Sequence, residues 1–244
     1  MNTVSHHSND HATTPALIGE GFTAPAAQAT PSATWWLALG AVAGPVLFVL
    51  AWLVLGELSP GYSPLRQQIS DLALGADGLF MGAAFVLSGL LLLAGVVGIF
   101  QAMRADVGTA ASFISAILLA LSPLGGVVVG VFNETAVAGH VTGAMLAFLT
   151  PIVSFLVTGL VLRRSPHWRR IGSWLLLASP LTLVLVFVFL QTGPPGAPLA
   201  ATGLGGLAER ALIVEIHAWF VALGALAFRR ASRWATRRIR SEAS

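Results

Sequence analysis

Six long apolar runs follow one another along the chain after residue 34. They cover residues 35–56, 79–103, 110–131, 141–162, 171–191 and 211–228, and the first five contain no charged side chain. An α-helix needs about 20 apolar residues to cross a hydrocarbon layer about 30 Å thick. None of the runs shows the two-residue alternation of a barrel strand. The pattern therefore predicts an all-α polytopic membrane protein, a bundle of six transmembrane helices.

The two ends of the chain differ from this apolar middle. Residues 1–34 are rich in Thr, Ala, Pro, Ser and His and contain neither Lys nor Arg, so they are too polar to form a buried core. Residues 229–244 carry six Arg. We expect a disordered cytoplasmic tail over 1–34, a transmembrane domain over 35–228 and a basic cytoplasmic tail over 229–244.

Charge is scarce and unevenly distributed. Only 9% of the 244 residues are charged, and all 13 cationic side chains are Arg, whereas about a quarter of the residues in a soluble protein are charged. If the six runs cross a membrane, eleven of these Arg lie on the side of the two termini. Because Arg and Lys accumulate in cytoplasmic loops, both termini are expected in the cytoplasm. The lack of Lys is typical of a high-GC bacterium, so we expect a multi-pass protein of the cell (inner) membrane.

The basic C-terminal tail could serve either of two partners. A pI near 11 would suggest nucleic acid in a soluble protein, but beside a membrane span the same charges favour anionic lipid head groups. The chain contains no Cys, which removes disulfides, thiolate metal sites and Cys nucleophiles. The expected partners are therefore the lipid bilayer and its anionic head groups, and not nucleic acid.

The segment after the first run predicts a short interfacial helix. Ser63 followed by Pro64 is a typical helix start, and Leu65, Ile69 and Leu72 then fall on one helical face. In such a helix Ser70 and Asp71 would point away from the apolar face. The alternative is a capped connector whose polar side meets only water.

The segment between the third and fourth runs brings an acid and an imidazole together. Asn133 and Glu134 follow the third run and His140 directly precedes the fourth, so Glu134 and His140 should lie at similar membrane depth. A carboxylate beside an imidazole can orient it as a base or a metal ligand. Ordinary loop residues in contact with water would produce the same pattern.

The sixth run is unusual because ionisable residues lie within it. Glu209 and Arg210 precede it, and Glu215 and His217 follow inside it. At 100° per residue, Glu209, Arg210 and His217 share one broad face, while Glu215 points to the opposite side and needs a different partner. Such residues usually face protein or a water-filled cavity, which makes them functional candidates. A buried ion pair with Asp71 or Glu134 is the competing interpretation.

These segments resemble a known family. The motif Pro-Gly-Tyr-Ser-Pro over 60–64, continued by Ile-Ser-Asp-Leu over 69–72, follows a first apolar run, an Asn–Glu pair precedes a His in the third loop, and Glu-Arg stands at the head of the last run. In these features the chain from about 35 to 228 is similar to the prokaryotic family named domain of unknown function 998 (DUF998). The resemblance implies a six-span integral membrane protein and supplies no mechanism.

The candidate residues leave three kinds of function open. The first is binding or transport of a small molecule, lipid head group or proton by an outer-side polar cluster, made of Ser70, Asp71, Asn133, Glu134, His140, Glu209, Arg210, Glu215 and His217. The second is a zinc-dependent intramembrane hydrolase, with Asp71, His140 and His217 as metal ligands and Ser70 or Glu134 assisting. The third is a structural or sensory membrane component without catalysis. Apart from that zinc alternative no cofactor is predicted, no catalytic residue is assigned, and a chain without Lys has no Walker-type nucleotide motif.

Overall fold

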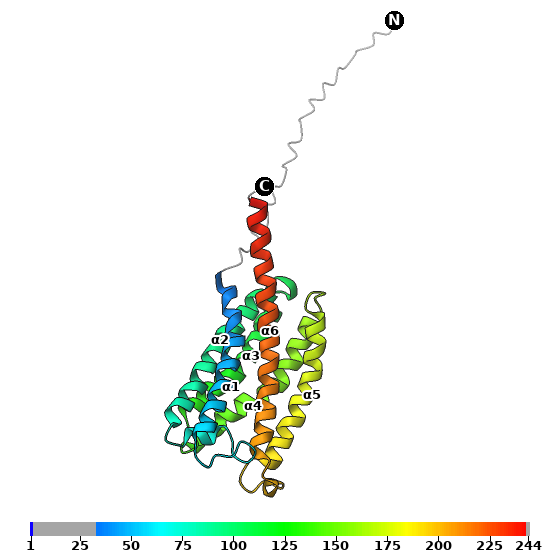
Figure 1. Cartoon of the computed structure of the whole chain (residues 1–244). Helices are drawn as coiled ribbons and strands as arrows, with labels where there is room; N and C mark the ends of the chain where they lie inside the picture. Colours follow the sequence, from blue (N-terminus) through cyan, green and yellow to red (C-terminus); the bar gives the residue numbers. More distant parts are fainter. Residues whose placement is uncertain (2–32, 243–244) are drawn as a thin grey trace. The chain divides into compact units, whose positions relative to one another are not determined.

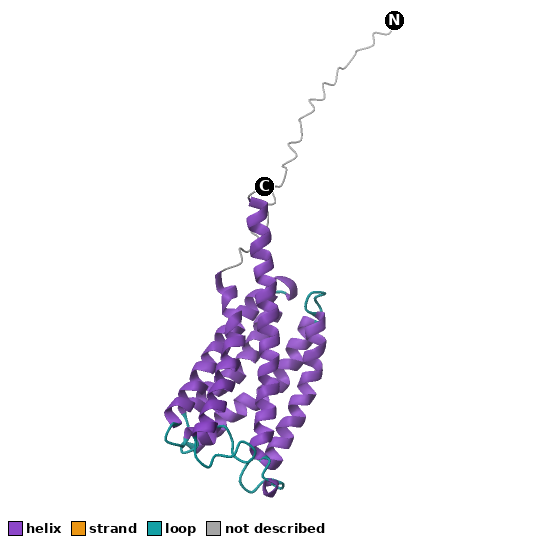
Figure 2. Ribbon diagram, in the orientation of Figure 1, coloured by secondary structure: helices purple, strands orange, loops and turns teal. Residues whose placement is uncertain are grey.

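The chain forms a bundle of helices. The computed structural model describes Met1 and residues 33–242, with side chains over 36–233. The elements, with η for 3-10 helices, are η1 (Ala33–Leu39), α1 (Gly40–Leu58), η2 (Ser70–Ala73), α2 (Gly78–Val107), α3 (Thr109–Val131), α4 (Val137–Leu162), α5 (Arg169–Thr192), η3 (Ala200–Thr202) and α6 (Gly205–Glu242). No strand occurs within these residues (Figure 2).

In the described part of the chain, six helices are long and apolar enough to cross a membrane, which confirms the all-α, six-span prediction. Most of them are longer than the apolar runs. The last helix, α6, begins at Gly205, six residues before the predicted run, and its backbone continues to Glu242. The expected tail over 1–34 lies almost entirely outside the described residues.

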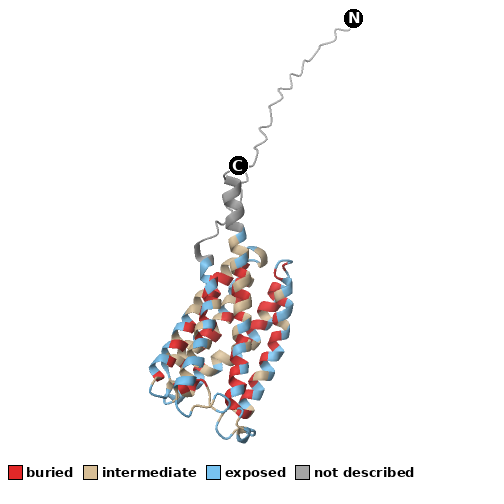
Figure 3. Ribbon diagram, viewed as in Figure 1, coloured by how far each residue is buried: buried red, intermediate tan, exposed pale blue. Residues whose placement is uncertain are grey.

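The outer surface of the bundle is apolar. Large side chains point outward along every spanning helix, with exposed fractions of 66% for Phe80, 61% for Leu177 and 61% for Phe187. Figure 3 shows this alternation of buried and exposed positions along the helices. Soluble proteins rarely expose apolar surface on this scale, so the surface is suited to lipid.

Helices that follow one another in the chain pack side by side from α1 to α5, and α6 closes the bundle against α1, α2 and α5 (Figure 1). The connections 59–77, 132–136 and 193–204 lie at one end of the bundle, which we name the odd-loop end. Gly108 and residues 163–168 form the connections at the opposite, even-loop end. Since α6 approaches α4 at only a few points, it is held mainly by α1, α2 and α5.

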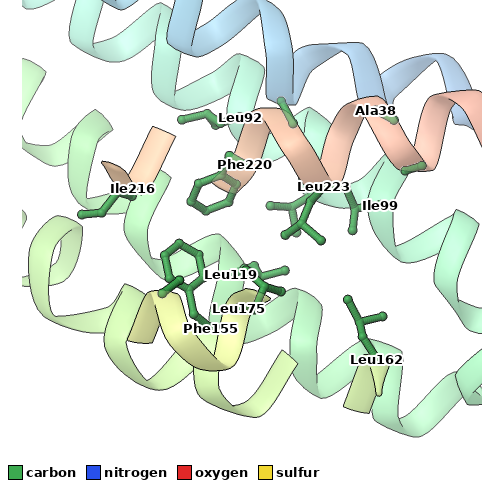
Figure 4. Close-up of a cluster of buried hydrophobic side chains, with 14 of the residues drawn as sticks. Ala38, Leu92, Ile99, Leu119, Phe155, Leu162, Leu175, Ile216, Phe220 and Leu223 are labelled. Carbon is green, nitrogen blue, oxygen red and sulfur yellow. The ribbon is translucent and has the colours of Figure 1, made fainter. Parts of the chain in front are cut away.

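A large apolar core runs along the inside of the bundle (Figure 4). Phe155 of α4 and Phe220 of α6 are fully buried, with ring centres 6.1 Å apart. Leu119 of α3 and Leu175 of α5 are also fully buried in this cluster. The core therefore joins α6 to the three helices that precede it.

One proline in the bundle is compensated by a neighbouring helix. Pro151 lies inside α4 and has no N–H to donate to the carbonyl of Ala147, four residues earlier. The hydroxyl of Ser122 on α3 donates to that carbonyl oxygen at 2.9 Å. The hydrogen bond that the proline removes within α4 is thus replaced by one between helices.

The first loop differs from the predicted interfacial helix. One turn follows Ser63, and a separate four-residue 3-10 helix, η2, covers Ser70–Ala73. Leu65 is 54% exposed while Ile69 is fully buried, so the expected apolar face does not form. The reason is a long-range contact. Residues of α6 form hydrogen bonds with the backbone groups of this loop that would otherwise bond within a continued helix.

Candidate functional site

A cavity of about 370 Å³ lies inside the bundle, with wall residues from all six spanning helices and from the loops of the odd-loop end. This volume falls in the range of about 300 to 1,000 Å³ found for small-molecule pockets. An aromatic wall, defined here as Phe48, Phe85, Phe148 and Phe189, comes from α1, α2, α4 and α5. The cavity is therefore largely apolar.

The polar side chains of the cavity gather toward the odd-loop end. They include Gln68, Ser70, Glu134, His140, Glu209 and His217. His217 lies deeper, about 12 Å beyond Glu209 along α6 at 1.5 Å per residue, and the wall also contains Ser88 of α2 and Ser122 of α3. The cavity thus has a polar end and an apolar interior, as an amphiphilic ligand would require.

The start of α6 holds the first loop against the cavity. Glu209 is 3% exposed, and its Oε2 accepts a hydrogen bond of 2.6 Å from the backbone N–H of Ile69. The two backbones come so close that a Cβ at Gly206 would lie 2.2 Å from the carbonyl oxygen of Gln67. Only glycine fits there, and the contact places Ser70 in the cavity wall.

Arg210 also holds the first loop, although it is not part of the cavity wall. Its guanidinium donates to the carbonyl oxygens of Gln67 and Gly206, both at 2.9 Å, and to the hydroxyl of Tyr62. It also lies over the ring of Trp52, 5.1 Å from the ring centre. Arg210 therefore binds carbonyls, a hydroxyl and aromatic faces, and no ion pair with a carboxylate forms within the described side chains.

The pKa values of two titratable groups in the first loop are shifted by this environment. Burial raises the pKa of the Tyr62 hydroxyl, and Arg210 opposes that rise. Burial also raises the pKa of the Asp71 carboxyl, and the neighbouring charge of Glu134 raises it further. Asp71 accepts a hydrogen bond of 2.9 Å from the N–H of Gln68 and lies beside the cavity rather than in its wall. Carboxyl groups are thus close together at the odd-loop end, and their proximity favours the protonated form of Asp71.

Two polar atoms beside the cavity have no partner. Ser70 is 3% exposed, and neither its Oγ nor Nδ1 of His217 forms a hydrogen bond. The ring of His217 meets Phe48 edge to face, with centres 5.6 Å apart. Buried polar atoms are nearly always hydrogen-bonded, so these two are available to a bound molecule or water.

The third loop contributes two of its three candidates to the cavity. Glu134 and His140 lie in its wall, as expected from their shared depth, and His140 Nδ1 lies 3.0 Å from the carbonyl oxygen of Phe132. Asn133 instead accepts hydrogen bonds from the N–H and hydroxyl of Thr135. It lines a separate hollow between α2 and α3.

Glu215 lies away from the cavity, as the helical geometry predicted. Its carboxylate accepts hydrogen bonds from the hydroxyl of Thr182 on α5, at 2.9 and 3.1 Å, and from Nε1 of Trp219 at 2.6 Å. The different partner required for Glu215 is therefore Thr182. This contact joins α5 to α6 within the spanning region.

The structure brings together Ser70, Glu134, His140, Glu209 and His217, and leaves Asp71, Asn133, Arg210 and Glu215 outside the cavity wall. The three suggested zinc ligands, Asp71, His140 and His217, do not meet: the described residues contain no group of three or more potential ligands placed to hold a metal ion. The zinc hydrolase remains a prediction without geometric support.

Sequence reasoning missed several residues of the site. Tyr62 is the only Tyr in the chain, and its place in the Gly-Tyr-Ser motif was a signal that could have identified it. The aromatic wall had no such signal, because a Phe that lines a cavity and a Phe that faces lipid look alike in a hydrophobic run. Gln68, in the cavity wall, was hidden in the same way within a polar loop.

Comparison with protein families gives one result that bears on this architecture. The family model described as "Protein of unknown function (DUF998)" matches residues 42–226. No curated protein and no solved structure matches the chain. The match covers α2 to α5 in full, most of α1 and the part of α6 up to residue 226, together with every residue of the cavity wall. The chain therefore belongs to the DUF998 family of integral membrane proteins.

Proposed function

We propose that this protein binds an amphiphilic small molecule or lipid in the cavity, with the polar part of the ligand at the odd-loop end. The observation that carries the proposal is the wall itself: an apolar interior, a polar end, and two buried polar atoms without partners, Ser70 Oγ and His217 Nδ1. Ionisable groups within a membrane protein usually face the interior of the bundle or a water-filled cavity, and they often mark a binding site. Transport would require in addition that this ligand leaves the cavity toward the even-loop end.

The proposed orientation places the odd-loop end outside the cytoplasm. Eleven of the 13 Arg belong to the other side, and positive charge favours the cytoplasmic face. The basic end of α6 would then lie near the anionic head groups of the inner leaflet, each Arg contributing about 1 kcal/mol. The polar end of the cavity would receive its ligand from outside or from the outer leaflet.

A cavity-filling variant tests the binding proposal. Gly126 lies in the cavity wall, and a Cβ built there meets no heavy atom within 4 Å, so a side chain can start there without a clash and Gly126→Phe is chosen to fill the space. Ile117→Phe, at a position of α3 that is 48% exposed, is the matched control. Native mass spectrometry and lipid analysis of the purified proteins should find a bound molecule that Gly126→Phe loses and Ile117→Phe keeps. A wild-type protein without any bound molecule, or equal retention in both variants, would contradict the proposal.

A further inference from the structure

We propose that the molecule held in the cavity carries an organic ammonium group, which binds at the odd-loop end between Glu134 and Glu209, while its apolar part packs on the aromatic wall. This inference rests on the proposed function and adds the chemical class of the ligand.

The first argument is the charge of the cavity wall. Its ionisable side chains are Glu134, His140, Glu209 and His217, and no Arg lies in the wall among the residues that the structure describes. Neither glutamate forms an ion pair with a cationic side chain in that part of the chain, where the ion pairs involve Asp106. The acidic end of the cavity thus lacks a cation of its own.

Arg210 is close enough for its charge to act on Glu209 and Asp71, but it lies outside the cavity wall. Its guanidinium is directed to the carbonyl oxygens of Gln67 and Gly206 and to the hydroxyl of Tyr62. The carboxyl group of Asp71 lies beside Glu134, and burial and the charge of Glu134 raise its pKa. A ligand with a carboxylate or phosphate would be repelled here, and a cationic one attracted.

The second argument is the hydrogen-bonding capacity of the wall. The Oγ of Ser70, a residue only 3% exposed, has no partner, and neither has Nδ1 of His217. Ser70 Oγ and the carboxylate oxygens of Glu134 and Glu209 offer acceptors at the odd-loop end, whereas Nδ1 of His217 lies about 12 Å further along α6. An ammonium group has up to three donors and no acceptor, so it matches this set better than an alcohol or an acid.

The third argument is the aromatic wall. Phe48, Phe85, Phe148 and Phe189 come from four different helices, and the faces of aromatic rings attract cations at distances up to about 6 Å. Rings can therefore stabilise the ammonium group and also cover an attached hydrocarbon chain. A small inorganic cation has no hydrocarbon part for this apolar surface to cover, which favours an organic amine.

Three probes with the same alkyl chain test the inference: decylamine, decanol and decanoate. Each is titrated at neutral pH, below its micelle-forming concentration, into the full-length protein in a neutral maltoside detergent, and the apparent Kd is taken from the rise in melting temperature. The partition of each probe into detergent is measured separately and used to correct its free concentration, so that probes as well as variants can be compared. Wild-type protein should bind decylamine at least about tenfold more tightly than decanol, because one hydrogen bond between charged groups contributes that much.

The variants Glu134→Gln and Glu209→Gln should each lower the affinity for decylamine about tenfold and leave that for decanol unchanged. Glu134→Gln is the principal variant, because Glu209 also holds the N–H of Ile69 and its replacement could loosen the loop. Glu57→Gln is the control: Glu57 is an exposed carboxylate at the same end of α1, outside the cavity wall. It should leave the affinity for decylamine as in the wild type.

The outcomes separate this inference from the proposed function. If the three probes bind equally and Gly126→Phe abolishes their binding, or if decanoate binds most tightly, the ammonium inference is overturned while the cavity remains a binding site. If no probe binds, or if Gly126→Phe changes nothing, the proposed function fails and the inference with it. Preference for decylamine that persists in both Glu134→Gln and Glu209→Gln also overturns the assigned role of these carboxylates.

Discussion

Two adjacent residues of α6 hold the first loop by opposite chemistry. Glu209 accepts a hydrogen bond from the N–H of Ile69, and Arg210 donates to the carbonyl oxygen of Gln67. Because both partners are backbone groups, the loop is fixed without regular secondary structure. Residue type alone could identify Glu209 and Arg210 as candidates, but it could not show that their partners are backbone atoms.

Replacing Arg210 should destabilise the protein strongly. Arg210→Gln cannot reach the carbonyl of Gln67 and the hydroxyl of Tyr62 together, and each buried group left unsatisfied costs about 1 to 3 kcal/mol. We expect a loss of about 2 to 4 kcal/mol in the free energy of unfolding, measured by denaturant titration in mixed micelles. Arg66→Gln, at an exposed position of the same loop, is the control and should stay within about 0.5 kcal/mol of the wild type. Equal losses in the two variants would contradict the role of Arg210.

Asp71 makes stability depend on pH in a defined direction. Its pKa is raised above the usual 3.8 by burial and by Glu134, so the folded protein holds this proton more tightly than the unfolded chain. The resulting stabilisation is fully present below pH 3.8 and is lost as pH rises through the folded-state pKa. Asp71→Asn has no proton to lose there, so its melting temperature should fall less than that of the wild type as pH rises from 4 to 7. A parallel pH dependence of the two proteins would show that Asp71 is not responsible.

At the scale of elements, hydrophobic runs identified all six spanning helices but not all of their ends. The start of α6 was missed because Gly205 to Ala208 is short and rich in glycine, and it continues the helix only because it packs on the first loop. The predicted interfacial helix is not confirmed, for the related reason that residues of α6 form hydrogen bonds with backbone groups of that loop. Local patterns predict elements whose partner is lipid, and they fail where the partner is a distant segment of the chain.

The contact between Ser122 and the carbonyl of Ala147 couples α3 to α4 through Pro151. Ser122→Ala should cost about 0.6 kcal/mol, the average for hydrogen bonds between membrane helices, and no more than about 1.7 kcal/mol. In Pro151→Ala the carbonyl regains a partner within α4, so the same serine replacement should cost less there. A double-mutant cycle on unfolding free energies measures this difference, expected at about 0.5 kcal/mol or more. Strictly additive effects would mean that the hydrogen bond from Ser122 does not compensate for the one that Pro151 removes.

At the scale of the whole molecule, the two ends of the bundle use their charges differently. At the even-loop end Asp106 accepts hydrogen bonds from Arg230 at 2.5 Å and from Nε1 of Trp168 at 2.7 Å, so its charge is paired and joins α2, α6 and the fourth connection. At the odd-loop end Glu134 and Glu209 face a cavity without a cation in its described wall. Paired charges stabilise a fold, while unpaired charges in a cavity favour a ligand, and this contrast supports a binding role for the odd-loop end.

That role depends on which side of the membrane the odd-loop end faces, and the cysteine-free chain allows a direct measurement. Ala201 lies in the exposed fifth connection, and Ser232 lies at the basic end of α6. Because the chain has no Cys, the variants Ala201→Cys and Ser232→Cys each carry one thiol. Because positive charge favours the cytoplasm, a membrane-impermeant maleimide applied to intact cells should label position 201 and not position 232, while both react after the membrane is permeabilised. Labelling of position 232 alone in intact cells would show that the bundle has the opposite orientation in the membrane. The acidic end of the cavity would then bind its ligand from the cytoplasm.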